Sequence, residues 1–352
     1  MTPVRKPSAN PKSVALILGG GAPNATLMAG ALEAFIDRQV RFELISTSGA
    51  GALIGLLYSA PRSGDPRAAL RALIDMGVDD AIYAQFPVNY KVFNKPGLLA
   101  DFWRQLCAAN PLLAALRQQQ DSSEAARFVN DWTQLMLASL CPSDLSADST
   151  GLCAHVPFID SVVDFDALAN SGPQFYLSAY NLSQRRMDSW DKTEIGKAQF
   201  LAAMSFPFLY PPYLLNGDYY IEGAALDTLN FKGLFQRHTA PIDSVVVFDV
   251  LGSERILHPP RDLYDAWVQS IIVPLTELAR DDLKLFQALH NVDPATGKPR
   301  CELLRVNFEE RMSASDNLHE LDWSHSNLAR LYDIGYETGH AFCKQHAEAL
   351  GL

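Results

Sequence analysis

A serine with very small neighbours stands at a predicted junction between a strand and a helix. In the segment LISTSGAGALIGLLY, Ser48 follows one apolar run and precedes a second one that begins at Gly51. A nucleophilic serine at such a turn needs small residues two places before and two places after it, because strand and helix crowd there, and the usual pattern is G-x-S-x-G. Ser46 and Ala50 occupy these two places. The pattern predicts that Ser48 is a nucleophile for acyl transfer.

Three consecutive glycines, Gly19, Gly20 and Gly21, lie at the preceding junction, in the segment LILGGGAPNATLMAG. Glycines let the backbone turn freely there, and the helix that follows points its unpaired N–H groups into the same space. Such a loop binds a phosphate or stabilises an oxyanion. The lysine of a P-loop and the third glycine of a dinucleotide-binding loop are both absent. Beside Ser48 the loop is best interpreted as an oxyanion hole, although a simple tight turn would use glycines too.

A base for Ser48 can be sought among histidines or carboxylates. None of the eight histidines stands in a recognisable strand-end loop; they are His155, His238, His258, His290, His319, His325, His340 and His346. A carboxylate serves instead when burial raises its affinity for protons. Glu222 ends the predicted strand YYIE, and Gly223 after it leaves room for a close approach. Asp218 and Asp227 are nearby, but Asp218 precedes the strand and Asp227 lies beyond the motif.

Four segments resemble, in order, the motifs of the patatin-like phospholipase family. LGGGAPNATLMAGALEAF resembles the family's glycine-rich oxyanion loop, STSGAGALIG its nucleophile elbow, AAMSFPFLYPPY a segment in which small residues precede a proline pair, and YYIEGAALD the D-G-[GA] motif of the catalytic acid. The closing LYDIGYETGHAF also resembles the family's last helix. The resemblance covers most of residues 13–60 and 170–345. It implies a Ser48–Glu222 dyad, an acyl-enzyme, and no metal or organic cofactor.

Two departures from the family pattern affect the predicted site. The family usually has aspartate at the position of Glu222, so the carboxylate here lies one methylene further from the backbone. In the glycine loop, Pro23 and Asn24 replace the usual basic residue and glycine, and proline has no N–H to donate. We expect the oxyanion donors among the other residues of the loop, which are Gly19, Gly20, Gly21, Ala22 and Asn24. These changes either re-tune the site or inactivate it.

The elements that must position these residues alternate in type along the chain. Strands are predicted at 13–18, 42–47, 174–179, 219–222, 244–250 and 303–306, a hairpin strand at 184–188, and helices at 25–38, 51–58, 197–204, 263–290 and 327–350. Such alternation is typical of an α/β fold with a mostly parallel central sheet. The resemblance implies the patatin-like three-layer sandwich. We expect a disordered lead over residues 1–12 and one hydrolase domain over 13–352.

The middle of the chain departs from this alternation. Residues 62–160 contain predicted helices at 66–76, 97–118 and 122–140, with aromatic and proline-rich stretches between them and a loop at 141–152. This length exceeds a plain crossover, so we interpret the segment as a helical insertion or cap. Its NPLLAALRQQQ stretch could line an acyl pocket or pack on the sheet.

Bulk composition limits the partners and the location. The formal net charge of -11 disfavours nucleic acid and anionic bilayers, so we expect no nucleic acid partner, and membrane contact that is peripheral at most. Five cysteines without a CxxC spacing indicate a reducing compartment and no zinc site. The apolar run after the N-terminal residues is too short for a secretory signal or a membrane span, so we expect a cytoplasmic protein. No pattern indicates the oligomeric state.

These features favour a serine acyl hydrolase that cleaves a lipid, ester or thioester. An acyltransferase would use the same dyad, since the two activities differ in whether water reaches the acyl-enzyme. A third hypothesis is a binding or regulatory protein that kept the fold and lost catalysis, and it is motivated by Pro23, Asn24 and Glu222.

Overall fold

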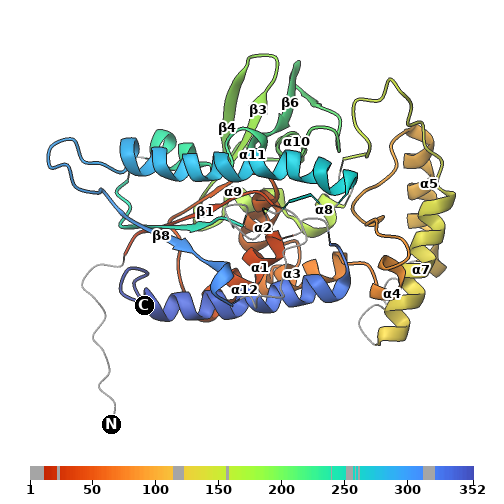
Figure 1. Ribbon diagram of the computed structural model, residues 1–352, viewed down its shortest axis with the longest axis horizontal. Helices are drawn as coiled ribbons and strands as arrows, with labels where there is room; N and C mark the ends of the chain where they lie inside the picture. The colour runs from red at the N-terminus through yellow and green to blue at the C-terminus, as the bar shows by residue number, and fades with distance from the viewer. Residues whose placement is uncertain are drawn as a thin grey trace, which may run out of the picture.

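A central sheet of eight strands organises the described part of the chain (Figure 1). The computed structural model describes residues 12–21, 24–113, 123–155, 158–238, 240–250, 257, 259–260, 262–311 and 322–352. The strand order is β5-β6-β3-β2-β1-β7-β8, and β4 pairs with β3 outside this path. The strands are β1 (Val14–Leu18), β2 (Leu44–Thr47), β3 (Gln174–Asn181), β4 (Arg186–Asp191), β5 (Tyr213–Leu215), β6 (Asp218–Glu222), β7 (Ser244–Phe248) and β8 (Glu302–Val306).

The strands that carry the predicted site are parallel neighbours. β1 pairs with β2 and β7, β2 pairs with β3, and β7 pairs with β8, all in parallel. β4 and β6 run antiparallel to β3, and β5 runs antiparallel to β6. Because parallel strands end at the same edge of a sheet, the loops after β1 and β2 meet there. The mostly parallel sheet predicted from the sequence is confirmed.

Helices cover both faces of this sheet. α1 (Ala25–Asp37), α2 (Ala50–Ser59) and α12 (His325–Gln345) pack on one face, and α11 (Leu263–Leu285) crosses the other (Figure 1). Side chains alternate along β1: Leu16 and Leu18 contact the core on the α1 side, whereas Ala15 and Ile17 contact the core on the α11 side. This confirms the α/β fold of three layers.

The segment predicted as an insertion contains several short helices and one helical pair. They are α3 (Pro66–Arg71), α4 (Asp80–Tyr83), α5 (Leu98–Ala109), α7 (Glu124–Leu140) and α8 (Ile159–Val162), followed by α9 (Phe165–Ala169) and α10 (Lys197–Ala203). α4, α5 and α7 lie to one side of the sandwich, at the right in Figure 1. Among the described helices, none is long and apolar enough to cross a membrane.

The structure corrects several predicted boundaries. The helix predicted at 97–118 is α5 up to Ala109, after which Asn110 is extended, and residues 114–118 lie outside the described ranges. The helix predicted at 66–76 divides into α3 and a 3₁₀ turn, Ala72–Met76. The helix predicted at 263–290 ends in a π turn, Phe286–His290, while β5 was not predicted at all. Residues 1–11 of the predicted lead lie outside the described residues.

Candidate active site

Ser48 lies between the last residue of β2 and the start of α2, as predicted. Gly49 has a φ of 52°, which a side chain would disfavour. Strand and helix crowd at this turn: a Cβ built on Gly51 would lie 2.4 Å from the carbonyl oxygen of Leu18. The small residues of the segment are therefore required by the close packing of α2 against the end of β1.

The Ser48 side chain is fully buried and its hydroxyl is already bonded. It donates to the main-chain carbonyl oxygen of Asp227 at 2.9 Å. The Ser48 N–H donates to the carbonyl oxygen of Leu18 at 3.0 Å. A hydroxyl has one hydrogen to donate, so in this arrangement the Ser48 hydroxyl is not bonded to a basic side chain. Sequence reasoning missed this contact because it is made by a main-chain atom, which no residue type signals.

Glu222 is the last residue of β6, and its carboxylate lies against the turn that carries Ser48. A Cβ built on Gly49 would be 2.2 Å from Glu222 Oε1, so the carboxylate contacts the residue next to Ser48. The Glu222 N–H donates to the carbonyl oxygen of Ser205 at 3.0 Å, which fixes the strand end. Glu222 is only 8% exposed, and this burial raises its pKa to about 8. A carboxylate of this kind is a much better base than an exposed glutamate.

The glycine loop ends β1 and begins α1. The Gly19 N–H donates to the carbonyl oxygen of Phe248 at 3.1 Å, so it is committed to the sheet. Gly20 and Gly21 line a cavity that Glu222 also lines. Gly21 has a φ of 119°, and its carbonyl oxygen accepts from the Ala25 N–H at 2.8 Å. Ala22, the fourth predicted oxyanion donor, lies outside the described residues, as does Pro23.

Asn24 is buried at the N-terminus of α1. Its side chain makes no capping hydrogen bond to the helix, and its Oδ1 atom has no hydrogen-bond partner. Buried amide oxygens are nearly always bonded, so an unpartnered one in a loop next to a candidate nucleophile deserves a functional explanation. Exchanging the two amide atoms by rotation would present Nδ2, a donor, in the same place.

A cavity of about 690 Å³ lies beside these residues. This volume is in the range of sites that hold small organic ligands. Gly20, Gly21 and Glu222 form a polar part of its surface, whereas most of the remaining wall is apolar. That wall comes from several elements and includes Leu53 of α2, Phe200 of α10, Phe206, and Val268, Ile271 and Leu275 of α11.

The Patatin-like phospholipase family model matches residues 16–235, which is more than half of the chain. The chain belongs to the patatin-like phospholipase family. The resemblance inferred from the four motifs is therefore confirmed. The match runs through residues 62–160 and ends before α11 and α12.

Solved structures with a similar fold are larger than this patatin-like chain. Human GIVD cytosolic phospholipase A2 matches at a TM-score of 0.48 and 12% identity, over 96% of this chain and 60% of that one. VipD from Legionella pneumophila matches at a TM-score of 0.40 and 12% identity, over 97% of this chain and 68% of that one. ExoU from Pseudomonas aeruginosa, in its complex with SpcU, matches at a TM-score of 0.35 and 14% identity, over 97% of this chain and 53% of that one. No curated protein sequence matches the chain.

The serine that replaces the first glycine of the patatin-like elbow has a structural explanation. The Ser46 hydroxyl donates to the carbonyl oxygen of Asn230 at 2.6 Å, and the Asn230 side chain donates to the carbonyl oxygen of Thr47 at 3.2 Å. Space for the Ser46 hydroxyl exists because residue 233 is glycine, where a Cβ would lie 2.6 Å from Ser46 Oγ. The segment after Glu222 thus holds the end of β2 just before the turn.

That segment is also held in place by charged side chains. The Asp227 carboxylate pairs with Lys232 Nζ at 2.6 Å, and Asp282 of α11 accepts from the Leu229 N–H at 2.9 Å. Burial and the neighbouring Asp227 raise the pKa of Asp282 to about 7. Asp227, which the sequence analysis set aside as a base, therefore belongs to an ion-paired segment and supplies the carbonyl oxygen to which Ser48 donates.

The described part of the stretch where the sequence allowed an acyl pocket does not form the wall of the cavity. In NPLLAALRQQQ, the described residues 110–113 do not line the cavity, and Leu112 is 75% exposed. The rest of that stretch lies outside the described residues. Helical spacing identified α11 as amphipathic, but only the three-dimensional packing brings its apolar face to the cavity that Glu222 also lines.

Proposed function

We propose that this chain hydrolyses the acyl ester of a lipid through an acyl-enzyme on Ser48, with Glu222 as the base. The position of the Glu222 carboxylate carries this proposal. It is buried, its pKa is raised to about 8, it contacts Gly49 next to Ser48, and it faces a largely apolar cavity. A base beside a candidate nucleophile at the wall of an apolar pocket fits ester chemistry on a hydrophobic acyl group.

The reaction begins when the Ser48 hydroxyl leaves the carbonyl oxygen of Asp227 and donates to Glu222. Its oxygen then attacks the ester carbonyl carbon, and the proton passes to the Glu222 carboxylate. The N–H groups of Gly20 and Gly21 and the amide of Asn24 are the candidate donors to the oxyanion. Glu222 returns the proton to the departing alcohol oxygen as the C–O bond breaks. Glu222 then takes a proton from water, and the resulting hydroxide attacks the acyl-enzyme carbonyl carbon. As the bond between the acyl carbon and Ser48 Oγ breaks, Glu222 returns the proton to Ser48 Oγ and the carboxylic acid leaves.

The cavity also supports a role for part of residues 62–160 as a cap. Met76, Asn89, Val92 and Phe93 of this segment line the cavity together with residues of the sandwich. We propose that this part of the segment closes over the acyl chain and determines how much water reaches the acyl-enzyme. An acyltransferase would differ from a hydrolase at this point and in no residue of the dyad.

One observation favours the alternative of an inactive binding protein. Ser48 is fully buried and bonded to Asp227, so catalysis requires a change of its side-chain rotamer. A chain that had lost catalysis would keep this arrangement permanently and bind a lipid in the cavity without cleaving it.

Ser48→Ala tests the proposed function directly. We expect it to lower kcat/KM on a short activated ester by at least about 10³-fold, because no acyl-enzyme can form. Ser178→Ala is a matched control, because Ser178 is also a buried serine and its hydroxyl has no hydrogen-bond partner. If Ser48→Ala retains most of the activity while both variants fold, Ser48 is not the nucleophile.

A further inference from the structure

The helix α7 has its polar and apolar faces inverted relative to an ordinary surface helix. Phe128, Trp132, Met136 and Leu140 are all exposed and lie four residues apart, so they share one face. On the opposite face, Asn130 and Asp131 are buried. A surface helix normally turns its charges to water and its apolar side chains to the core. Here the side that faces the protein carries the charges.

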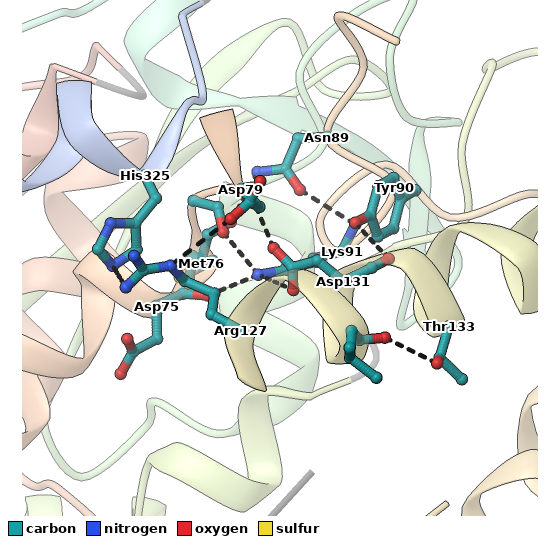
Figure 2. Close-up of polar contacts among 12 residues, drawn as sticks. Asp75, Met76, Asp79, Asn89, Tyr90, Lys91, Arg127, Asp131, Thr133 and His325 are labelled. Carbon is teal, nitrogen blue, oxygen red and sulfur yellow. Dashed lines mark hydrogen bonds and ion pairs between the residues drawn. The ribbon is translucent and has the colours of Figure 1, made fainter. Parts of the chain in front are cut away.

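The charged face of α7 is held by a network on the body of the protein (Figure 2). Lys91 Nζ lies 2.9 Å from Asp131 Oδ1, and the Asp79 N–H donates to Asp131 Oδ2 at 2.7 Å. The Tyr90 hydroxyl donates to the carbonyl oxygen of Asp131 at 2.8 Å. Arg127 reaches His325 of α12, with 3.3 Å between Nη1 and Nε2. These contacts fix the rotation of α7, so its apolar stripe faces outward because the network requires it.

The neighbouring helix α5 repeats the same feature. Leu98, Phe102 and Leu106 are exposed at spacings of four residues. The Trp103 indole N–H donates to the carbonyl oxygen of Leu137 at 3.0 Å, which ties α5 to α7. Two adjoining helices thus each expose an apolar stripe. Exposed apolar surface of this extent on a folded protein marks a site of contact with another apolar surface.

The location and charge of these stripes indicate which surface that is. Residues 89–92 connect them to the cavity: Asn89 and Val92 line it, while Tyr90 and Lys91 bind α7. From residue 125 to the end of α7 the only charged residues are Arg127 and Asp131, which belong to the inward network. The outward face of α7 therefore offers no charge to an anionic headgroup, and on α5 the exposed Asp101 carboxylate is paired with Arg104. A net charge of -11 repels such a headgroup.

We propose that the α5–α7 face, defined by Leu98, Phe102, Leu106, Phe128, Trp132, Met136 and Leu140, docks the protein on a lipid surface without net charge, such as a zwitterionic bilayer. The proposal rests on the proposed function, because a lipid substrate enters the cavity from such a surface. The rings of Phe128 and Trp132 stack with their centroids 6.4 Å apart. In the docked protein both rings enter the interfacial region of the bilayer, where aromatic side chains are favoured. Asp131 and Lys91 stay on the protein side.

Co-sedimentation with vesicles tests the docking face. The Ser48→Ala chain, which leaves lipid intact, is mixed with vesicles of pure phosphatidylcholine, and the partition coefficient is measured with and without Phe128→Ser and Trp132→Ser. We expect these two substitutions together to lower partitioning by about tenfold to hundredfold, since they remove two large apolar groups from the interface. Leu285→Ser with Leu289→Ser is the matched control, because Leu285 at the end of α11 and Leu289 in the π turn after it are both exposed. It should partition like its parent.

Enzymatic readouts separate this proposal from the proposed function. In the otherwise wild-type chain, Phe128→Ser with Trp132→Ser should leave hydrolysis of a soluble short ester unchanged within about twofold while slowing hydrolysis of vesicle lipid. If no ester is hydrolysed but vesicle binding still depends on the two residues, the function fails and the docking face stands. Equal partitioning of the variant and its parent, or no binding of the parent to phosphatidylcholine, overturns the docking face. A parent that is dimeric and becomes monomeric in the variant would assign the face to self-association and also overturn it.

Discussion

The hydroxyl of Ser48 donates to a main-chain carbonyl, and the reaction we propose requires it to donate to Glu222. A change of rotamer about one side-chain bond is fast and small in energy beside an ester-hydrolysis barrier. Ser46, which stands where the family's elbow has glycine, also fits a functioning elbow, because glycine at position 233 leaves room for the Ser46 hydroxyl. The resting arrangement is thus compatible with catalysis, and substitutions at single residues can test it.

Glu222 gives the first of these tests. Glu222→Gln keeps the shape of the side chain but cannot accept a proton, so activity on a short ester should fall by about 10³-fold or more. Glu222→Asp restores the residue usual in the family. Because the longer side chain of Glu222 reaches Gly49 here, we expect aspartate to fall short by one methylene and lower kcat by about 10²-fold. A rise in activity with aspartate would instead indicate a weakened hydrolase.

The raised pKa of Glu222 predicts opposite effects of pH on activity and on stability. The pKa of the Glu222 carboxyl rises from its ordinary value of 4.5 to about 8 in the folded protein. Between these values the folded protein holds a proton that the unfolded chain releases, so the stabilising contribution of Glu222 declines as pH rises through that window. Activity should rise over the upper part of it, with an inflection near 8, because only the unprotonated carboxylate is a base. Thermal unfolding should show Glu222→Gln gaining Tm relative to wild type from about pH 5 to about pH 9. A difference in Tm that is independent of pH would contradict this assignment.

Asn24 is a separate test of the oxyanion hole. Its side chain does not cap α1, so Asn24→Ala should affect catalysis more than helix stability. We expect kcat to fall by about 10²-fold with little change in KM if the amide stabilises the oxyanion. Asn130→Ala is a matched control, since Asn130 is also buried with an unpartnered amide nitrogen but lies in α7. Unchanged kcat in Asn24→Ala would leave Gly20, Gly21 and Ala22 as the remaining candidate donors.

Among elements, those with a strong local signal were predicted well. β1 and β7 are continuous apolar runs, and α1, α2, α10 and α12 have clear helical spacing, so sequence and structure agree within a few residues. β5 was missed because it has only three residues and follows two prolines. The positions of Ser48 and Glu222 followed from motifs, whereas the Asp227 carbonyl contact and the α11 wall depend on packing between distant segments. Local pattern carries no information about such contacts.

The inverted helix α7 leads to a prediction about stability. Lys91→Met leaves the fully buried Asp131 carboxylate without its cation, which typically costs about 3–5 kcal/mol. Amide hydrogen exchange should therefore show α7 opening more easily by a comparable amount. Adding Asp131→Asn removes the unpaired charge but keeps an acceptor for the Asp79 N–H, so the double variant should recover more than half of the loss. No recovery would mean that the ion pair does not hold α7.

At the scale of the whole molecule, one sheet edge joins the parts of the proposed site. The loops after β1 and β2 supply the glycines and Ser48, β6 supplies Glu222, and α11 and residues of the 62–160 segment complete the cavity. The same segment carries the α5–α7 face on its outer side. Site, acyl cavity and docking face are thus contiguous, as a hydrolase that takes its substrate from a lipid surface requires.

Covalent labelling of Ser48 tests the central claim most directly. A fluorophosphonate reacts with a serine hydroxyl that a neighbouring base activates, and the adduct is located by mass spectrometry of the digested protein. The account predicts a single adduct on the peptide that contains Ser48, formed faster as pH rises toward 8 and about 10²-fold slower in Glu222→Gln. An intact, folded chain that is not labelled at Ser48, or is labelled equally fast without the Glu222 carboxylate, would contradict the Ser48–Glu222 dyad.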